Sequence, residues 1–427
     1  MEKITGFFGI LIILALCYLM SYNKKAINYK TVITGLIIQF LLALFILKVP
    51  VGQFIFSKIA VFINKILEFA TQGANFVFGP LTNSPEVLDK LFGPDKSFMF
   101  ALQLIPSLIF MMILINILYY YNIMQKVISF LGKLMNKIMD VSGAEALSNV
   151  ASSFVGQVVA QITIKPYLPN LTRSEVLASM TGSLACISGA LLAVYAGLGV
   201  NIEYMIAACV MAAPGALVVS KIIYPEIQVA QTKTDFKITT SKRRRTAVNV
   251  LDAISKGASE GMKVGLNVVA MLIALIALIA LLDWFLGLFG NFMYSVCHLN
   301  LDFIGLDVQN LSIKMIFGKI FSVFAFIMGV PLNEVSSVGA LLGEKIVLNE
   351  AIAYADYVRM TLSPRASIIS VFALCGFANF ASVAILISGV GELAPNQRKN
   401  LARMGMRALI GGTFTSYISA CMAGLLL

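Results

Sequence analysis

Charged residues are scarce in this sequence: Asp, Glu, Lys and Arg together make up 12% of its 427 residues. A soluble domain carries about a quarter charged residues and is about half apolar, whereas 59% of this chain is hydrophobic. Such a composition cannot be hidden inside one core and needs lipid as its solvent. The shortage of charge therefore excludes an ordinary soluble globular protein and predicts an all-α, polytopic membrane protein.

Histidine and paired cysteine motifs are also missing. The one histidine, His298, lies in an expected loop without a partner pattern, so it is a weak candidate for a metal ligand or catalytic base. The six cysteines are scattered and form no C-x-x-C motif, so neither a metal site nor a disulfide framework is indicated. No catalytic Ser-His-Asp set and no paired metal-binding carboxylates appear either. The sequence therefore predicts a protein that is not an enzyme and uses no cofactor.

Long apolar runs are what the sequence does contain. A helix needs about 20 apolar residues to cross a bilayer, and about eight segments approach or exceed that length. They cover residues 4–22, 31–49, 98–121, 176–198, 203–223, 264–290, 366–390 and 405–427. The first run is followed by "NKKAINYK" rather than a small-residue cleavage site, so we expect a spanning helix there and not a signal peptide. Residues 125–140 and 308–328 are expected to form amphipathic helices at the membrane interface.

The net charge of +11 is best explained by membrane topology, because basic residues of membrane proteins gather in cytoplasmic loops. Lysines follow the first run, three more lie in 125–140, and 224–262 contains "SKRRRTAV". If these segments lie inside, both termini lie outside, and we expect a multi-pass protein of a bacterial inner membrane in contact with lipid. The "KRRR" stretch then anchors the topology, and no nucleic-acid partner is expected.

Two weakly hydrophobic segments, residues 145–172 and 335–365, are rich in Gly, Ser, Asn and Glu. Each precedes two of the apolar runs, but they follow expected helices on opposite sides of the membrane. This order is the outline of an inverted repeat with two re-entrant hairpins that meet near the midplane. We therefore expect scaffold helices and an inner interfacial helix in 1–144, the first repeat in 145–223, the basic loop, a scaffold helix and the outer interfacial helix in 224–334, and the second repeat in 335–427.

Polar residues inside these segments are the candidates for function. The Asn349-Glu350 pair lies in the second interrupted segment, and a carboxylate within the membrane is costly and usually functional. The alternatives are an ion pair with Lys345 or an exposed loop. Asn379 and Ser382 lie in the next run, "FALCGFANFASVAI", where Gly376 can interrupt or thin the helix. Their alternative role is to form hydrogen bonds between packed helices.

These segments resemble the concentrative nucleoside transporter family, in its bacterial branch. The likeness is carried by "GEKIVLNEAIAY", "FALCGFANFASVAI" and "GQ" followed by "KPYLPNLTRSEVLASMTGSLACISGALLAVYAGLGV". The opening "SYNKKAINYKTV" and the ending "LARMGMRALIGGTFTSYISACMAGLLL" also fit, so the likeness runs nearly end to end. The resemblance implies a homotrimer of subunits with eight spanning helices, two oppositely entering hairpins and interfacial helices. It also implies sodium- or proton-coupled import of a nucleoside by alternating access.

The resemblance implies that the second hairpin and the following helix hold the ribose. The matching residues are Glu350, Asn379 and Ser382, with Phe377 packing nearby. This chemistry is reasonable, because ribose hydroxyls are donors and a desolvated carboxylate accepts them in strong, charge-assisted hydrogen bonds.

The first hairpin would hold the base. There the family usually shows Gly-Gln-Thr-Glu or Gly-Gln-Asn-Glu, whereas residues 156–159 read "GQVV". Gln157 is retained, Val158 and Val159 replace the polar pair, and Leu191 is expected to line the same site. Base donors left unpaired cost about 1–3 kcal/mol, so uridine-like recognition should weaken roughly tenfold to a hundredfold. Ala351 stands where the family has an aromatic residue, which adds space.

The cation site implied by the resemblance is altered too. The positions that match its side-chain ligands are Ser152 and Cys186, and the positions that match its carbonyl ligands are Val155 and Ile187. Sodium prefers oxygen ligands, Cys is a poor one, and Ser is shorter than the Asn of sodium-coupled relatives. Both sodium bound through carbonyls and water, and proton coupling through Glu350, therefore stay open.

The leading interpretation is a secondary active importer of a nucleoside or a nucleoside-like riboside. One alternative is a transporter of a different sugar-like or ribosylated solute with altered ion coupling. Another is a passive facilitator or a sensor on the same fold, because the cation site is eroded.

Overall fold

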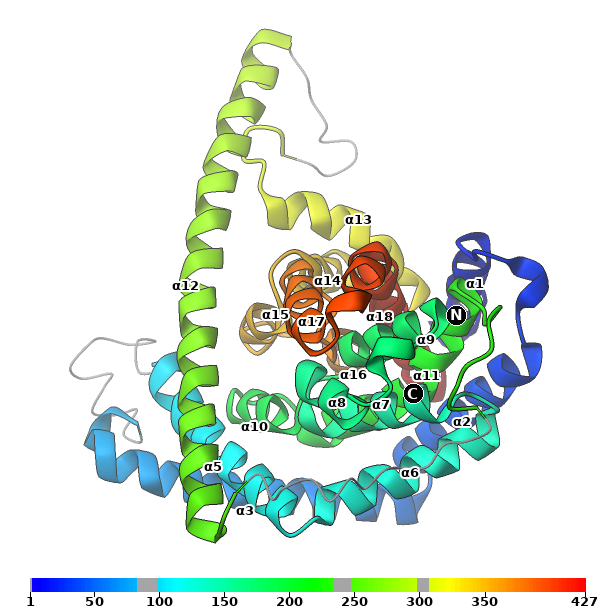
Figure 1. The fold of residues 1–427 in the computed structure, drawn as a ribbon. Coiled ribbons are helices and arrows are strands. Elements are labelled where there is room, and N and C mark those ends of the chain that lie inside the picture. The colour runs from blue at the N-terminus through cyan, green and yellow to red at the C-terminus, as the bar shows by residue number, and fades with distance from the viewer. Residues whose placement is uncertain (1, 83–98, 234–246, 298–306) are drawn as a thin grey trace.

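The computed structural model describes residues 2–82, 99–233, 247–297 and 307–427. Every regular element in these ranges is a helix, which confirms the all-α prediction. His298 and the "KRRR" stretch lie outside the described residues. Figure 1 shows a central bundle of α7–α11 and α14–α18, with α3, α5 and α6 along one side of it and α12 as a long helix at its edge.

The N-terminal helices lie around this bundle. They are α1 (Glu2–Leu19), α2 (Tyr29–Leu47), α3 (Pro50–Phe78), α5 (Phe100–Tyr120) and α6 (Ile123–Met139), with short 3-10 turns at Lys24–Ala26 and Gly79–Leu81. The chain bends by 76° between α5 and α6. Helix α6 matches the interfacial helix predicted at 125–140. It turns Ile128, Gly132 and Met139 inward and packs against α7.

Helix α3 was not predicted from the sequence. It buries only small residues, Gly52, Ala60, Ala70 and Ala74, and exposes large apolar side chains such as Phe62 and Phe76. Small residues on one face let α3 approach its neighbours closely, and the large apolar face points away from the bundle.

The first repeat begins with a hairpin, as predicted. Its helices are α7 (Gly143–Val155), α8 (Gln157–Thr163), η3 (Leu168–Asn170), α9 (Arg173–Ala185), α10 (Gly189–Gly197) and α11 (Ile202–Ile223). The Gln161 amide donates to the Ser148 hydroxyl over 3.0 Å although the residues are 13 positions apart. An unbroken helix would separate them by about 20 Å. The chain therefore reverses at Gly156, whose φ of 86° suits glycine.

Residues 335–427, predicted as the second repeat, contain a similar order of α-helices, with the 3-10 helix at a different place. The helices are α14 (Val335–Val347), α15 (Glu350–Tyr357), α16 (Pro364–Leu374), α17 (Phe380–Leu393), η5 (Pro395–Gln397) and α18 (Arg398–Leu426). Lys314, on the predicted outer interfacial helix α13 (Ile313–Ile327), binds one acid on each limb of the second hairpin. Its ammonium lies 2.8 Å from Glu344 and 2.7 Å from Asp356. Both limbs therefore run side by side.

Two of the predicted spans contain a break in the helix, although Arg173–Gly197, which includes the first break, still counts as one stretch long and apolar enough to cross a membrane. The run 176–198 is interrupted between α9 and α10, and the run 366–390 between α16 and α17. The two breaks touch. Gly376 has a φ of 153°, and a Cβ there would lie 2.9 Å from the carbonyl oxygens of both Leu184 and Ala185. Only glycine permits this contact, so the two breaks meet through buried backbone atoms without side chains between them.

Five helices in the described ranges are long and apolar enough to cross a membrane, or six if the bent pair α5–α6 counts as one span. Helices α1, α16 and α17 are shorter apolar helices. Helix α12 (Val250–Cys297) is longer than the predicted run 264–290. It packs closely on α5 because Gly257 and Gly261 leave room for the α5 backbone.

Candidate functional site

Glu350 lies at the point where the second hairpin turns back. It is the first residue of α15, and only 5% of it is exposed. Its Oε1 accepts a hydrogen bond of 2.8 Å from the Tyr195 hydroxyl, and its Oε2 accepts one of 3.1 Å from the Asn379 amide. A buried carboxylate needs such donors, because a buried charge without partners is very unfavourable. The structure therefore joins Glu350 and Asn379, two of the residues that the resemblance assigns to the ribose site.

Asn379 and Ser382 occupy the start of α17, directly after the second broken span. The Asn379 Oδ1 caps this helix by accepting a 2.7 Å bond from the Ser382 backbone N–H. Asn349 caps α15 in the same way through the Ile352 N–H, at 3.0 Å. Two helix N-termini therefore begin around Glu350, and the positive ends of their dipoles favour its negative charge.

Phe377 lies in the same break, two residues before Asn379. It is 7% exposed, and its carbonyl accepts a 2.8 Å bond from the Asn379 N–H. This bond fixes the turn that presents the Asn379 side chain to Glu350.

Tyr195 was not predicted as a site residue. It lies on α10 in the apolar stretch "GALLAVYAG", is 1% exposed, and packs on Tyr354 with 4.9 Å between ring centroids. The available signal was a tyrosine in an apolar segment, because a buried tyrosine hydroxyl usually finds a partner. Leu191 precedes Tyr195 by one helical turn, so both lie on one face of α10.

Lys345 does not form the ion pair with Glu350 that the sequence left as an alternative. It is fully buried, and its ammonium donates to the Ala373 carbonyl at 3.4 Å. No ion pair in the described ranges joins it to Glu350. The donors to Glu350 are therefore the neutral groups of Tyr195 and Asn379.

The first hairpin presents Gln157 in the position that Glu350 has in the second, as the first residue after the turn. The Gln157 backbone carbonyl accepts a 3.2 Å bond from the Ser183 hydroxyl. Its side-chain oxygen has no hydrogen-bond partner in the described part of the chain. Val158 packs against Gly389 of α17, and Val159 is 40% exposed.

Gln157 and Leu191 each lie close in sequence to one partner of a tight contact between the first hairpin and the break before α10. A Cβ on Gly156 would lie 3.0 Å from the Ser188 Cβ. The Ser188 hydroxyl caps α10 through the Leu191 N–H, at 3.3 Å. Within the described ranges, no hydrogen bond links the predicted base-binding residues directly to Glu350; α10, which carries Leu191 and Tyr195, connects the two groups.

The residues predicted for a cation lie beside this contact. The Ser152 hydroxyl donates to the Ser148 carbonyl at 2.8 Å and lies 3.1 Å from the Ser183 hydroxyl. The Cys186 thiol points back to its own helix and donates to the Gly182 carbonyl at 3.1 Å. The Cys186 side chain therefore supplies no oxygen ligand to a cation.

Backbone carbonyls are better suited to sodium here. Val155 is the last residue of α7, and carbonyls of a last helical turn lack intrahelical partners. The Ile187 carbonyl lies in the next break and has only a long contact of 3.8 Å from the Cys209 thiol. The Ser152 hydroxyl and the carbonyls of Val155 and Ile187 are oxygen atoms, the type of ligand that sodium prefers, whereas the Cys186 thiol is not.

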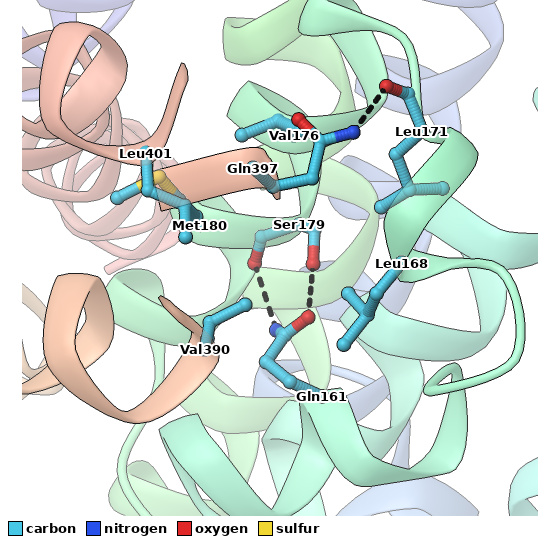
Figure 2. A pocket seen from close by; sticks show the side chains of 9 residues that line it. All are labelled: Gln161, Leu168, Leu171, Val176, Ser179, Met180, Val390, Gln397 and Leu401. Carbon is cyan, nitrogen blue, oxygen red and sulfur yellow. Dashed lines mark hydrogen bonds between the residues drawn. The ribbon is translucent and has the colours of Figure 1, made fainter. Parts of the chain in front are cut away.

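A separate pocket lies between the first hairpin and the second repeat. It is lined by Gln161, Leu168, Leu171, Val176, Ser179, Met180, Val390, Gln397 and Leu401. Figure 2 shows Gln161 bonded to Ser179, and the Gln397 amide donates to the Leu171 carbonyl at 3.0 Å. None of the predicted substrate or cation residues lines this pocket, so it is distinct from the site around Glu350.

Comparison with known proteins decides the family. A family model described as "Na+ dependent nucleoside transporter C-terminus" matches residues 204–424, and its N-terminal counterpart matches residues 8–81. A third, described as "Nucleoside recognition", matches residues 101–201. The chain belongs to the Na+ dependent nucleoside transporter family. This confirms the resemblance found in the sequence, and because the family is one of transporters, it confirms a transporter rather than an enzyme.

Similar proteins cover the whole chain. The uncharacterized transporter YutK of Bacillus subtilis is 38% identical over 100% of both chains. The nucleoside permease NupC of Helicobacter pylori is 34% identical over 98% of this chain and 96% of its own. The inward-facing, substrate-bound structure of CNTnw is 34% identical with a TM-score of 0.90, over 100% of this chain and 98% of that one. A CNTnw double variant in an outward-facing state is 34% identical with a TM-score of 0.91, over 100% of this chain and 98% of that one.

Family membership and the long apolar helices make this chain an integral membrane protein. Structures of CNTnw show an inward-facing state and, for a double variant, an outward-facing state, which are the two end states of alternating access.

Proposed function

We propose that this chain imports a nucleoside or nucleoside-like riboside together with a cation by alternating access. The observation that carries the proposal is the buried Glu350 carboxylate, held by the Tyr195 hydroxyl and the Asn379 amide at the start of two half-helices. A carboxylate offers about four acceptor positions, of which these donors use two. The remaining positions suit the hydroxyl groups of a ribose, and Ser382 lies one helical turn from Asn379.

The residues proposed to face the base form a mostly apolar wall. Val158, Val159 and Leu191 offer no hydrogen bond from their side chains, and Gln157 offers an amide whose oxygen lacks a partner in the described ranges. Such a wall accepts a base or another aglycone with few polar edge groups. It disfavours uridine, whose N3–H donor and carbonyl acceptors would stay unpaired.

The proposed coupling ion is sodium, in keeping with the family. Ser152 and the carbonyls of Val155 and Ile187 would hold it, and Cys186 would contribute little. Proton coupling through Glu350 is the competing proposal. Replacing sodium by choline while a proton gradient is imposed tests both: loss of uptake supports sodium, and accumulation that continues without sodium supports the proton.

The arrangement in the membrane is also part of the proposal. The distribution of Lys and Arg supports a bacterial inner membrane protein with both termini outside. The repeated order of elements supports the division into 1–144, 145–223, 224–334 and 335–427, with the two repeats as the moving part. The apolar, largely exposed face of α12 supports a homotrimer in contact with lipid. Cross-linking in native membranes would test the trimer.

The central experiment compares two Glu-to-Gln variants in proteoliposomes. Glu350→Gln keeps the shape but removes the charge that strengthens hydrogen bonds from ribose, so uptake of the nucleosides that the wild type carries should vanish. Glu392→Gln changes an exposed acid at the end of α17 and should leave uptake intact. Normal uptake by Glu350→Gln would contradict the proposed function.

A passive facilitator or sensor is the second candidate, because Cys186 offers a soft sulfur in place of an oxygen ligand, and its thiol donates to the Gly182 carbonyl. Accumulation of substrate above its outside concentration, driven by an imposed sodium or proton gradient, distinguishes the two. A facilitator equilibrates the substrate but never accumulates it.

A further inference from the structure

The hydrogen bond between Tyr195 and Glu350 joins the two repeats at the candidate site. Tyr195 belongs to α10 in the first repeat, and Glu350 to α15 in the second, 155 residues later. Both side chains are almost completely buried. The bond is short at 2.8 Å, as expected for a hydroxyl that donates to a carboxylate.

Each oxygen of Glu350 has its own donor. Tyr195 binds Oε1, and Asn379 binds Oε2 at 3.1 Å. A carboxylate held at both oxygens cannot rotate about its last side-chain bond, whereas a carboxylate held at one oxygen can. The direction of the unused lone pairs is therefore fixed by Tyr195 and Asn379 together.

The Tyr195 ring is itself held in place. It packs on Tyr354 at 4.9 Å and an interplanar angle of 38°. Tyr354 is anchored separately, because its hydroxyl donates to the Val371 carbonyl at 3.0 Å. Tyr195 and Tyr354 are thus adjacent buried tyrosines, of which only Tyr195 donates to Glu350.

We propose that Tyr195 is a positioning residue that aims the free lone pairs of Glu350 at the sugar hydroxyls, and so sets the preference for ribosides over deoxyribosides. The proposal rests on the proposed function. Without the phenol, Glu350 keeps Asn379 as its donor but can turn, and one oxygen then seeks water or another group. A sugar hydroxyl forms a weaker hydrogen bond with a carboxylate that is not held in place. Removing that hydroxyl from the substrate should then reduce uptake less than it does in the wild type.

The test uses the full chain in proteoliposomes with Tyr195→Phe, and Tyr354→Phe as its matched control. Uptake of adenosine and uridine is compared with that of their 2′-deoxy and 3′-deoxy forms. A hydrogen bond from ribose to a charged group should give the wild type a preference of roughly tenfold or more for one hydroxyl. Tyr195→Phe should bring that preference close to one, and Tyr354→Phe should leave it unchanged.

Difference infrared spectroscopy supplies a readout that needs no substrate. The carboxyl band of Glu350 is assigned by its loss in Glu350→Gln. It should move toward the frequency of a less hydrogen-bonded group in Tyr195→Phe and stay in place in Tyr354→Phe. Tyr195→3-fluorotyrosine keeps the packing with a more acidic phenol, and should move the band in the opposite direction even if Tyr195→Phe fails to fold.

An unchanged riboside preference in Tyr195→Phe would overturn the proposal, and so would an equal change in Tyr354→Phe, which would point to ring packing instead. Failure of the wild type to transport any of these nucleosides counts against the proposed function. The infrared comparison then decides for or against the positioning of Glu350 by Tyr195.

Discussion

Val158 packs into the space left by the missing side chain of Gly389. A Cβ on Gly389 would lie 3.0 Å from Val158 Cγ1 and 3.1 Å from Cγ2. Val158 belongs to the first hairpin and Gly389 to α17, so this contact closes the first repeat against the second. In this state, the side chain predicted to read the base also seals the contact between the repeats.

Gly389→Ala should therefore disturb the contact. The new methyl group lies closer to Val158 than packed side chains normally allow, and overpacking costs about 1–3 kcal/mol. We expect a lower Tm in detergent and slower uptake, both restored by adding Val158→Ala. Gly287→Ala in α12 is the control, because nothing lies within 4 Å of the new methyl. Equal Tm values for Gly389→Ala and Gly287→Ala would show that the contact is not tight.

Val158→Thr with Val159→Glu should raise the affinity for uridine. The pair restores a hydroxyl and an acid for the base donors, and pairing them should improve binding roughly tenfold or more. Isothermal titration calorimetry measures the change. Val229→Glu, at a residue that is 94% exposed, controls for added charge. No gain over Val229→Glu would mean that these valines do not face the base.

Asn379 combines two roles that substitution can separate. Asn379→Ser keeps a capping hydroxyl for α17 but is too short to reach Glu350, whereas Asn379→Ala loses both contacts. We expect both variants to lose uptake, and only Asn379→Ala to lose about 1 kcal/mol of stability from the missing cap. Asn201→Ala removes the exposed cap of α11 and should keep uptake. Uptake retained by Asn379→Ser would argue that the Glu350 contact is dispensable.

Cys186→Ser should strengthen sodium binding. It replaces a soft sulfur by the hard oxygen that alkali cations prefer. We expect a larger thermal shift on changing choline chloride to sodium chloride, and a lower sodium concentration for half-maximal uptake. Cys421→Ser, in the equally buried interior of α18, should change neither value. If the two serine variants respond alike, Cys186 does not lie at the ion site.

Lys221 should matter for stability more than any surface ion pair. Its ammonium lies 2.7 Å from Glu145 and 2.9 Å from the Ser174 hydroxyl, in a cluster that ties the starts of α7 and α9 to the end of α11. Removing one partner of a buried pair costs about 3–5 kcal/mol, because the other charge is left alone. Lys221→Met should therefore lower the Tm strongly.

Lys256→Met is its matched control. Lys256 and Asp252 form an i,i+4 pair with side chains 45% and 32% exposed, and exposed pairs contribute only about 0.2–1 kcal/mol. A small, similar Tm change for both lysine variants would show that Lys221 is not an essential buried charge.

The sequence was informative wherever the chain departs from the rules for a simple span. Polar residues and prolines in 145–172 and 335–365 predicted two hairpins, and both are present, with turns at Gly156 and before Asn349. Glu350 could be identified because an acid in an apolar membrane segment is energetically costly and is usually functional. The family, the helical class and the role as a transporter could all be predicted from such residues.

The sequence did not reveal the break in 176–198 or helix α3, whereas Gly376 indicated that the run 366–390 can be interrupted. A break at Cys186 leaves the apolar run intact, because an unwound segment buried against another protein segment needs no polar side chains of its own. Helix α3 carries its small residues inward and its large apolar residues outward, the reverse of the pattern that identifies a helix in a soluble protein.

The sequence by itself determined that this chain is a membrane protein and that two hairpins interrupt its apolar segments. It also determined that Glu350, Asn379 and Ser382 are polar residues within an apolar interior. Those conclusions depend on local composition, because hydropathy and the cost of burying a charge can be judged from short stretches of sequence. Only the tertiary structure decided that Tyr195 meets Glu350, that Val158 lies on Gly389, and that the two breaks cross at Gly376. Such contacts join residues far apart in the sequence. They depend on how closely two backbone segments approach each other, and no local sequence pattern encodes that distance.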